Sequence, residues 1–169
     1  MHTKKLENSS QEDPHCHHIH CNKKSFQEIV YETFKSWTFK ITKPRLAVIH
    51  CLENAKKPLS PKNIFEQIKQ ENKSKIDQVS VYRVLESLTQ LGLVHQIYPS
   101  GDYVSCQTSC EKKPSHILLS CIKCKNTSEM QLEWNFIESI FGKIKLSAKF
   151  NPVGHMMQIN GVCMECQSE

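Results

Sequence analysis

Two pairs of cysteines near the end of the chain have the spacing of a metal site. Cys121 and Cys124 are separated by two residues, and Cys163 and Cys166 repeat that spacing with thirty-eight residues between the pairs. Two such pairs complete the tetrahedral four-sulfur shell that a structural zinc prefers. A redox pair would occur once, at the start of a helix, and two disulfides are the other alternative. We predict a closed zinc site whose loss unfolds the small domain it holds together.

A second group of metal-binding side chains lies near the N-terminus. Four histidines and two cysteines occur within seven residues: His15, Cys16, His17, His18, His20 and Cys21. The flanking residues have no hydrophobic periodicity with which to build a core. We expect residues 1–24 to form a flexible tail, either with an auxiliary zinc site or with only incidental metal affinity.

The length and composition restrict the class of protein. A chain of 169 residues has room for one large or two small domains, and a metal site confined to its last third favours two. The sequence has no apolar run typical of a signal peptide or a membrane span, so we expect a cytoplasmic protein with no membrane contact. Nine cysteines then indicate metal and thiol chemistry in a reducing compartment.

Basic residues are concentrated in one part of the chain. Residues 23–97 contain thirteen Lys or Arg against seven Asp or Glu, whereas the rest of the chain contains nine against ten. This imbalance indicates a polyanionic partner for that segment, although solvated lysines alone could produce it.

The same segment has the pattern of short helices followed by a hairpin. Apolar residues at helical spacing predict a first helix from residue 25, and candidate caps at Thr42 and Ser60 predict the start of two more. A fourth helix is expected from about Asp77 to Leu91, with Gly92 as the terminating residue. Two strands follow, 93–98 and 103–106, joined by a turn. This order predicts a winged helix-turn-helix, in which the polar face of the fourth helix is either a solvated surface or, as we expect in a basic segment, a DNA-reading surface.

The remaining residues predict a second domain that mixes strands and helix. Strands are expected at 117–121, at about 127–132 and at 156–162, with a helix that begins near Trp134 between the last two. The fold class is therefore α+β.

Three motifs in order resemble the ferric uptake regulator superfamily of bacterial metal-sensing repressors. They are the run 42–45 (Thr-Lys-Pro-Arg), the run 79–85 (Val-Ser-Val-Tyr-Arg-Val-Leu) and the two cysteine pairs, and the resemblance covers residues 26–166. It implies a homodimer in which each chain has a winged-helix DNA-binding domain, residues 25–106, and a small α/β dimerisation domain with a structural zinc, residues 107–169. No motif provides an open catalytic site with a general base, so we expect no enzyme.

The resemblance also implies which residues contact double-stranded operator DNA. Tyr82 and Arg83 match residues of the family's recognition helix, with Ser80 nearby. Lys40 matches a lysine that reaches into the minor groove, and Arg45 matches an arginine of the family pattern. The two cysteine pairs match the family's structural zinc ligands.

A second metal site is expected at the junction of the two domains. His95 and Cys106 lie at opposite ends of the wing hairpin, and His116 and Glu129 follow around the first two strands of the second domain. These four residues resemble the His, Cys, His and Glu sensing site of the zinc uptake regulator branch, and a thiolate favours zinc over ferrous or manganous ions. The alternative is that Cys106 is a small buried residue and His95 a surface histidine.

Three residues leave the choice of metal ligands open. His116 precedes Cys121 by five residues, whereas the zinc branch more often has this histidine about two residues earlier, and Cys110 is an alternative ligand in the same loop. His155 matches a histidine of a third, weaker site in some relatives.

The resulting expectation is a zinc-responsive repressor that carries about two zinc ions per chain, one structural and one regulatory. It would bind operator DNA as a zinc-loaded dimer and repress zinc uptake genes. The alternatives are an iron, manganese, nickel or peroxide sensor on the same scaffold, or a zinc-buffering protein that uses the N-terminal tail.

Overall fold

The computed structural model describes residues 24–71, 75–107, 116–152 and 157–168. The N-terminal His and Cys group, Cys110 and His155 lie outside these ranges. The elements in chain order are α1 (Phe26–Ser36), α2 (Lys43–Glu53), α3 (Pro61–Gln70), α4 (Gln78–Gln90), β1 (Val94–Gln96), β2 (Tyr103–Ser105), β3 (His116–Cys121), β4 (Thr127–Gln131), α5 (Trp134–Ala148), β5 (Met157–Gly161) and α6 (Met164–Gln167).

Each of the first four helices begins at a side chain that accepts a backbone hydrogen bond. An N-cap oxygen satisfies one of the N–H groups that have no partner within the first turn of a helix. These caps are Ser25, Thr42, Ser60 and Asp77. At the other end of α4, Gly92 has φ +70° and its N–H bonds to the Thr89 carbonyl, which confirms the expected helix end.

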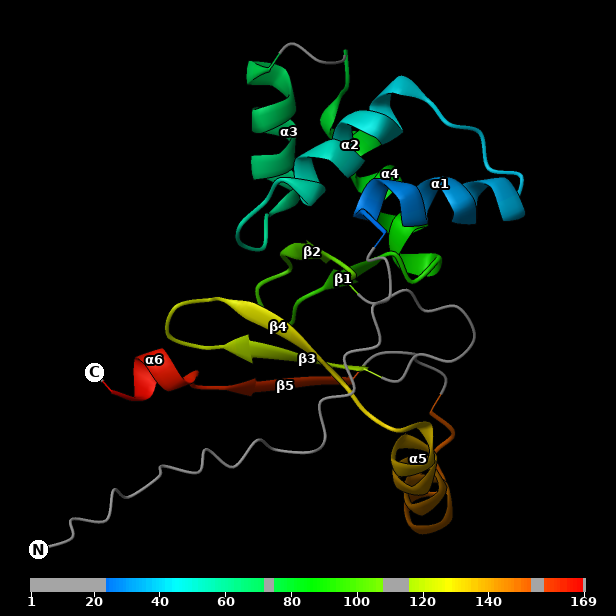
Figure 1. Ribbon diagram of the computed structural model, residues 1–169, viewed down its shortest axis with the longest axis vertical. Helices are drawn as coiled ribbons and strands as arrows, with labels where there is room; N and C mark the ends of the chain where they lie inside the picture. The colour runs from blue at the N-terminus through cyan, green and yellow to red at the C-terminus, as the bar shows by residue number, and fades with distance from the viewer. Residues whose placement is uncertain (1–23, 72–74, 108–115, 153–156, 169) are drawn as a thin grey trace, which may run out of the picture.

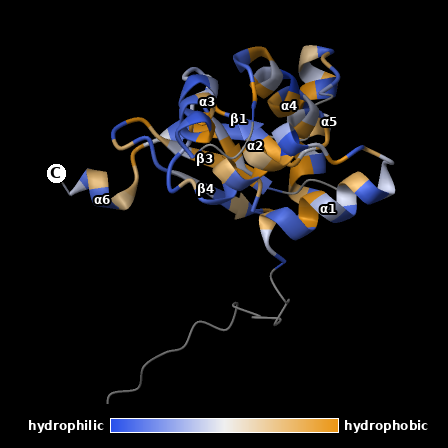
Figure 2. Cartoon of the chain, turned by 90° about the horizontal axis from the view of Figure 1, so that it is seen from above, coloured by the Kyte–Doolittle hydropathy of each residue, from blue (hydrophilic) through white to orange (hydrophobic). Residues whose placement is uncertain are grey.

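The four helices share one apolar core. Figure 2 shows hydrophobic and hydrophilic residues in alternation along α1, as expected for a helix with one buried side. The largest fully buried side chains of this core are Phe34, Leu52, Ile64, Ile68, Leu85 and Leu88.

The wing consists of β1 and β2, paired antiparallel with His95 opposite Val104. Both strands are shorter than predicted. β1 ends at Gln96, because the residues that follow form turn hydrogen bonds such as Gly101 N–H to the Ile97 carbonyl at 2.8 Å, and β2 ends at Ser105, one residue before the predicted end. Leu59, just before α3, pairs with Tyr103 in a single antiparallel bridge, which joins the segment before α3 to the hairpin.

The C-terminal part is a three-stranded mixed sheet in the order β4-β3-β5. β3 runs antiparallel to β4 and parallel to β5. His116 is the first residue of β3, one position earlier than the predicted strand start, and the short helix α6 was not predicted. In Figure 1 the wing lies between the four helices and this sheet, so the α+β class and the two-part architecture are confirmed. Among the described residues, no helix has the length and apolarity needed to cross a membrane.

Candidate metal centres and DNA-reading surface

The four paired cysteines converge on one point. Cys121 is the last residue of β3, Cys124 lies in the following turn, Cys163 precedes α6 and Cys166 is within it. Their sulfur atoms all lie within 4.8 Å of one another. The Cys124 and Cys163 sulfurs are 3.7 Å apart, close to the edge of about 3.8 Å that a tetrahedron with Zn–S bonds of about 2.3 Å would have. The geometry therefore fits a closed four-sulfur zinc site.

Local backbone structure brings each cysteine pair together. In the first turn the Lys125 N–H bonds to the Cys121 carbonyl at 3.0 Å, and Lys125 itself adopts φ +62°. In the second the Gln167 N–H bonds to the Cys163 carbonyl at 3.0 Å. A link that the sequence did not indicate joins the two turns: the Lys123 ammonium donates to the Cys166 carbonyl at 2.6 Å.

Two of the thiols, those of Cys121 and Cys166, differ in acidity. Hydrogen bonds from backbone N–H groups, first that of Cys163 at 3.4 Å, lower the pKa of Cys121 to about 6. Contact with the neighbouring thiols, first Cys163, raises the pKa of Cys166 to about 12. Four adjacent thiolates repel one another, so a cation is needed before all four sulfurs are ionised, and its binding releases protons.

The second candidate centre joins the wing to the sheet. His95 comes from β1 and Cys106 directly follows β2, while His116 opens β3 and Glu129 lies in β4. Their ligand atoms also lie within 4.8 Å of one another. The two histidines are each 1% exposed and Cys106 is 4% exposed. The structure thus brings together all four residues expected from the sequence.

The distances between these donor atoms suit an ion with tetrahedral coordination. The Cys106 sulfur lies 3.9 Å from His116 Nε2 and 3.9 Å from Glu129 Oε2. His95 Nε2 lies 3.5 Å from Glu129 Oε1 and 2.9 Å from His116 Nε2. Zinc bonds of about 2.0–2.3 Å give tetrahedral edges of about 3.3–3.8 Å. Only the separation of the two imidazole nitrogens is shorter, so an ion would spread them by a few tenths of an ångström.

A backbone group holds the carboxylate of this site in place. The Gln107 N–H lies 3.1 Å from both oxygens of Glu129. Such outer contacts orient a ligand and are part of the design of most metal sites. Gln107 follows Cys106, so the same short segment supplies one ligand and positions another. The sequence contained no signal for this contact, because the two residues come together only when the wing meets the sheet.

The exposed face of α4 carries the residues expected to read DNA. Tyr82 is 49% exposed, and Arg83 is also exposed. Ser80 is partly engaged within the helix, since its hydroxyl donates to the Asp77 carboxylate at 3.1 Å. That contact and the Ser80 N–H, the larger cause, lower the pKa of Asp77. The structure places these side chains on one surface, and no DNA contact is part of it.

Arg45 has internal contacts that its expected role did not include. Its guanidinium lies 5.6 Å from the centre of the Phe34 ring and 5.3 Å from that of Phe39. It also donates to the Lys40 carbonyl at 2.5 Å. The side chain therefore fixes the segment that presents Lys40, whose own side chain is exposed.

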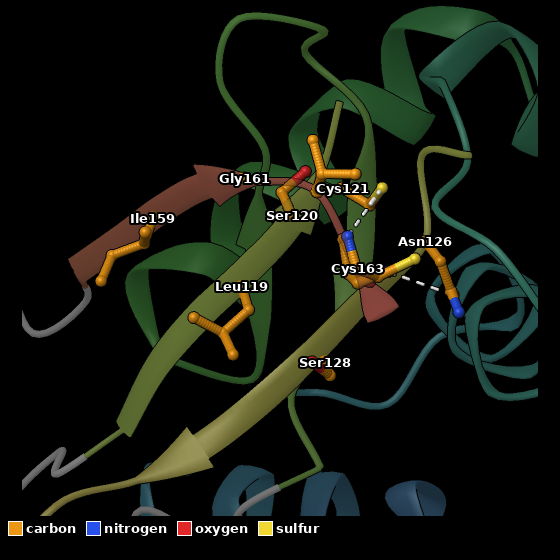
Figure 3. A pocket seen from close by; sticks show the side chains of 10 residues that line it. Leu119, Ser120, Cys121, Asn126, Ser128, Ile159, Gly161 and Cys163 are labelled. Atoms are coloured by element: carbon orange, nitrogen blue, oxygen red, sulfur yellow. Dashed lines mark hydrogen bonds between the residues drawn. The ribbon is translucent and has the colours of Figure 1, made fainter. Parts of the chain in front are cut away.

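One face of the C-terminal sheet is apolar and accessible. Figure 3 shows Leu119 and Ile159 near Cys121 and Cys163, which lie in two different turns. They line a pocket of about 240 Å³. Several large apolar side chains around this part of the chain are more than two-fifths exposed: Met130, Phe136, Leu146, Phe150, Ile159 and Met164. Such a concentration of apolar surface is typical of a protein interface.

Known proteins resemble the chain over most of its length. The model of the ferric uptake regulator family matches residues 36–160. The ferric uptake regulation protein of Bacillus subtilis (strain 168) is 30% identical over 137 residues, 79% of this chain and 89% of that protein. The corresponding protein of Campylobacter jejuni is 27% identical over 147 residues, 84% of this chain and 91% of its own.

Solved structures share the fold. Holo XcZur has a TM-score of 0.72 at 21% identity and covers 86% of this chain and 99% of its own. A zinc uptake regulator complexed with zinc and DNA has a TM-score of 0.72 at 19% identity, over 86% and 97%. The Helicobacter pylori ferric uptake regulator has a TM-score of 0.53 at 23% identity, over 86% and 95%.

The family consists of transcription regulators that bind DNA as dimers, not of enzymes. The winged-helix architecture, the two clusters of metal-binding side chains and the family match over residues 36–160 lead to one conclusion. This chain belongs to the ferric uptake regulator family of metal-responsive transcriptional regulators.

Proposed function

We propose that the chain is a zinc-responsive repressor whose regulatory ion is held by His95, Cys106, His116 and Glu129. The observation that carries the proposal is the convergence of these four donors from two parts of the fold within 4.8 Å. Two imidazoles, one thiolate and one carboxylate at tetrahedral spacing suit zinc, whereas ferrous and manganous ions prefer shells without sulfur. The fold shared with holo XcZur and with a zinc uptake regulator complexed with zinc and DNA is consistent with this choice.

The proposed site acts by fixing the wing on the sheet. Without a shared ion, the wing and the sheet are joined here by hydrogen bonds and by the His95–Glu129 contact, which are weaker than metal–ligand bonds, so the winged helix can adopt several orientations. With the ion, His95 and Cys106 are held to His116 and Glu129, and one orientation is favoured. In a dimer that orientation would set two α4 helices at the separation of successive major-groove half-sites, about 34 Å.

We propose that α4 is the recognition helix, with Tyr82 and Arg83 at the bases and phosphates and Ser80 nearby. Lys40 would add a minor-groove contact at the end of the same surface, and Arg45 would act mainly by holding the Lys40 backbone. An arginine fork suits guanine edges and phosphates alike. The basic excess of residues 23–97 supports a polyanionic partner on this side.

The paired cysteines would hold the structural zinc, and the accessible apolar face of the sheet would be covered by a second copy of the chain. Dimer interfaces bury apolar side chains of this kind. A zinc ion held by the four sulfurs would add to the small apolar core of the C-terminal part. Repression of zinc uptake genes in a cytoplasm with plentiful zinc is the expected output.

The test is an operator titration with protein that carries only its structural zinc. An operator duplex is first selected from a random DNA pool, and binding is then followed by fluorescence anisotropy against buffered Zn(II), Fe(II) and Mn(II). The proposal expects Zn(II) to induce binding at the lowest free concentration. A lower threshold for Fe(II) or Mn(II) would instead identify a sibling sensor, and binding with no metal dependence would exclude a metal switch.

The His and Cys group at positions 15–21 remains a proposed auxiliary site, outside the described residues. One observation favours a role near the regulatory centre: Lys24 and Ser25 line a pocket of about 220 Å³ together with Cys106 and Gln107. Cys21 is three residues from Lys24 in the sequence. Metal stoichiometry of the full chain against a chain starting at residue 23 measures whether this group binds zinc.

A further inference from the structure

We propose that Gln158 holds the tip of the wing on the sheet, and that this second contact acts together with the regulatory ion to fix the orientation required for operator binding. The proposal rests on the function proposed above and assigns Gln158 a positioning role in it. The side chain lies in β5, on the opposite edge of the sheet from Glu129. It is not one of the candidate metal ligands, and no sequence motif singles it out.

The contact is a paired hydrogen bond between a side-chain amide and one backbone residue. Gln158 Oε1 accepts from the Tyr98 N–H at 3.0 Å, and Gln158 Nε2 donates to the Tyr98 carbonyl at 2.6 Å. The amide therefore satisfies both backbone groups of Tyr98, as a partner strand would. Asn160 Oδ1 accepts a second bond from the same Nε2 at 2.6 Å, which fixes the orientation of the amide.

The register of the sheet aligns this contact with the regulatory centre. Leu118 of β3 is opposite Glu129 of β4 and opposite Gln158 of β5, so the three residues form one row across the sheet. Side chains in register on adjacent strands project from the same face, and two strand spacings separate the outer members by about 10 Å. The wing residues they meet, His95 and Tyr98, are three positions apart, which is also about 10 Å along an extended chain. The wing thus lies across the strands and is held at two matching points.

Two points of attachment fix the orientation of the winged helix, which one point does not. A single ion at the base of the wing leaves rotation of the winged helix about that point. A second contact about 10 Å away removes this rotation and defines the direction of α4. The wing turn also faces the first cysteine turn, since Tyr98, Asp102, Cys121 and Lys125 line one small pocket of about 70 Å³. The platform on which the wing docks is therefore the part of the sheet that the structural zinc would hold.

The test compares Gln158→Leu with the wild-type protein, both loaded with zinc. Leucine has a similar size and removes both bonds to Tyr98. With two partly exposed neutral hydrogen bonds lost, we expect operator affinity to fall roughly 5- to 30-fold. The same shift from closed to open forms should weaken zinc binding at the regulatory site, because coupling between two ligands is reciprocal. The zinc content of the four-cysteine site should not change.

Two further variants separate the clamp from general effects. Asn160→Ala removes only the acceptor that orients the amide, so its loss of operator affinity should be smaller than that of Gln158→Leu. Gln70→Leu makes the same chemical change at an exposed position at the end of α3 and should leave operator affinity within about twofold, as for most surface substitutions.

Hydrogen exchange at the Tyr98 amide provides a readout that needs no DNA. In zinc-loaded wild-type protein we expect protection of this N–H, and in Gln158→Leu we expect that protection to be lost while the core of α1–α4 stays protected. Unchanged Tyr98 exchange, or operator affinity within twofold of wild type, would overturn the clamp. Failure of the wild-type protein itself to bind DNA in response to metal would overturn the proposed function instead, and the exchange result would still decide the clamp.

Discussion

Replacing Cys106 by alanine tests the proposed regulatory site most directly. The substitution removes the only sulfur of the four donors and leaves two imidazoles and a carboxylate. Three donors without the thiolate form a weaker and less zinc-selective shell. We therefore expect Cys106→Ala to lose zinc-dependent operator binding while the protein stays folded and keeps its structural zinc.

The expected loss of stability follows from the burial of Cys106, and the expected loss of zinc response follows from the usual size of coupling between two ligands. Cys106 is 4% exposed, and truncation of so small a buried side chain should cost about 1 kcal/mol, or roughly 4–8 °C in the Tm of a domain of 60–100 residues. The effect on operator binding should be larger than the effect on stability. Coupling between an effector and a ligand is typically about 5- to 150-fold, and we expect the gain in operator affinity on zinc addition to fall from that range to about one.

The assay is an anisotropy titration of an operator duplex at fixed salt, with and without buffered zinc. Cys51→Ala is the matched control, because Cys51 is also a buried thiol, 8% exposed, and lies in the helical core with its thiol donating to Gln67. It should lose similar stability and keep the full zinc response. If Cys106→Ala still binds operator only with zinc, the assignment of this residue as a ligand is wrong.

Three other predictions address the structural zinc and the DNA surface. Cys163→Ala should unfold the C-terminal part and dissociate the dimer, and native sedimentation and circular dichroism of the variant would contradict a structural site. Arg83→Ala should weaken operator binding by about 1–3 kcal/mol and relax the preference for particular bases. Lys40→Ala should weaken binding to all DNA sequences alike and reduce the slope of log affinity against log salt concentration by about one. If both variants had equal effects on operator and scrambled DNA, the assignment of Arg83 to bases and of Lys40 to contacts that do not depend on sequence would be wrong. Zinc uptake by the four cysteines of metal-free protein at pH 7.5 should release close to four protons, because the C-terminal part is unfolded without zinc and its thiols, with a reference pKa of about 8.5, are mostly protonated; a pH indicator in weak buffer measures this number.

Most elements of the fold could be predicted from local sequence. Ser60 and Asp77 begin helices because their side chains can accept hydrogen bonds from the first turn, and Gly92 ends α4 because glycine adopts positive φ without strain. The strand ends were less predictable, since Ile97 and Tyr98 were predicted to lie in the strand, whereas β1 ends at Gln96. α6 was missed because four residues carry no periodicity, and it follows from the turn that Cys163 and Cys166 share.

The candidate sites differ in how far apart in the sequence their residues lie, and so in how well the sequence predicts them. The spacing of the paired cysteines identifies them as metal ligands, because two residues between two thiols fit one tight turn. His95 and Cys106 could be related through the hairpin, but their meeting with His116 and Glu129 was available only through resemblance to a family. The role of Arg45 as a support for Lys40, the hold of Gln107 on Glu129 and the contact between Gln158 and Tyr98 had no sequence signal.

The sequence by itself determined the helices of the winged domain, the paired cysteines and the basic segment, since each depends on residue type and short spacing along the chain. Only the tertiary structure decided how the wing lies on the sheet. That arrangement depends on strand register, on burial of two histidines at 1% exposure and on hydrogen bonds between residues sixty positions apart. Contacts of this range are fixed when separate elements pack together, so no local pattern encodes them.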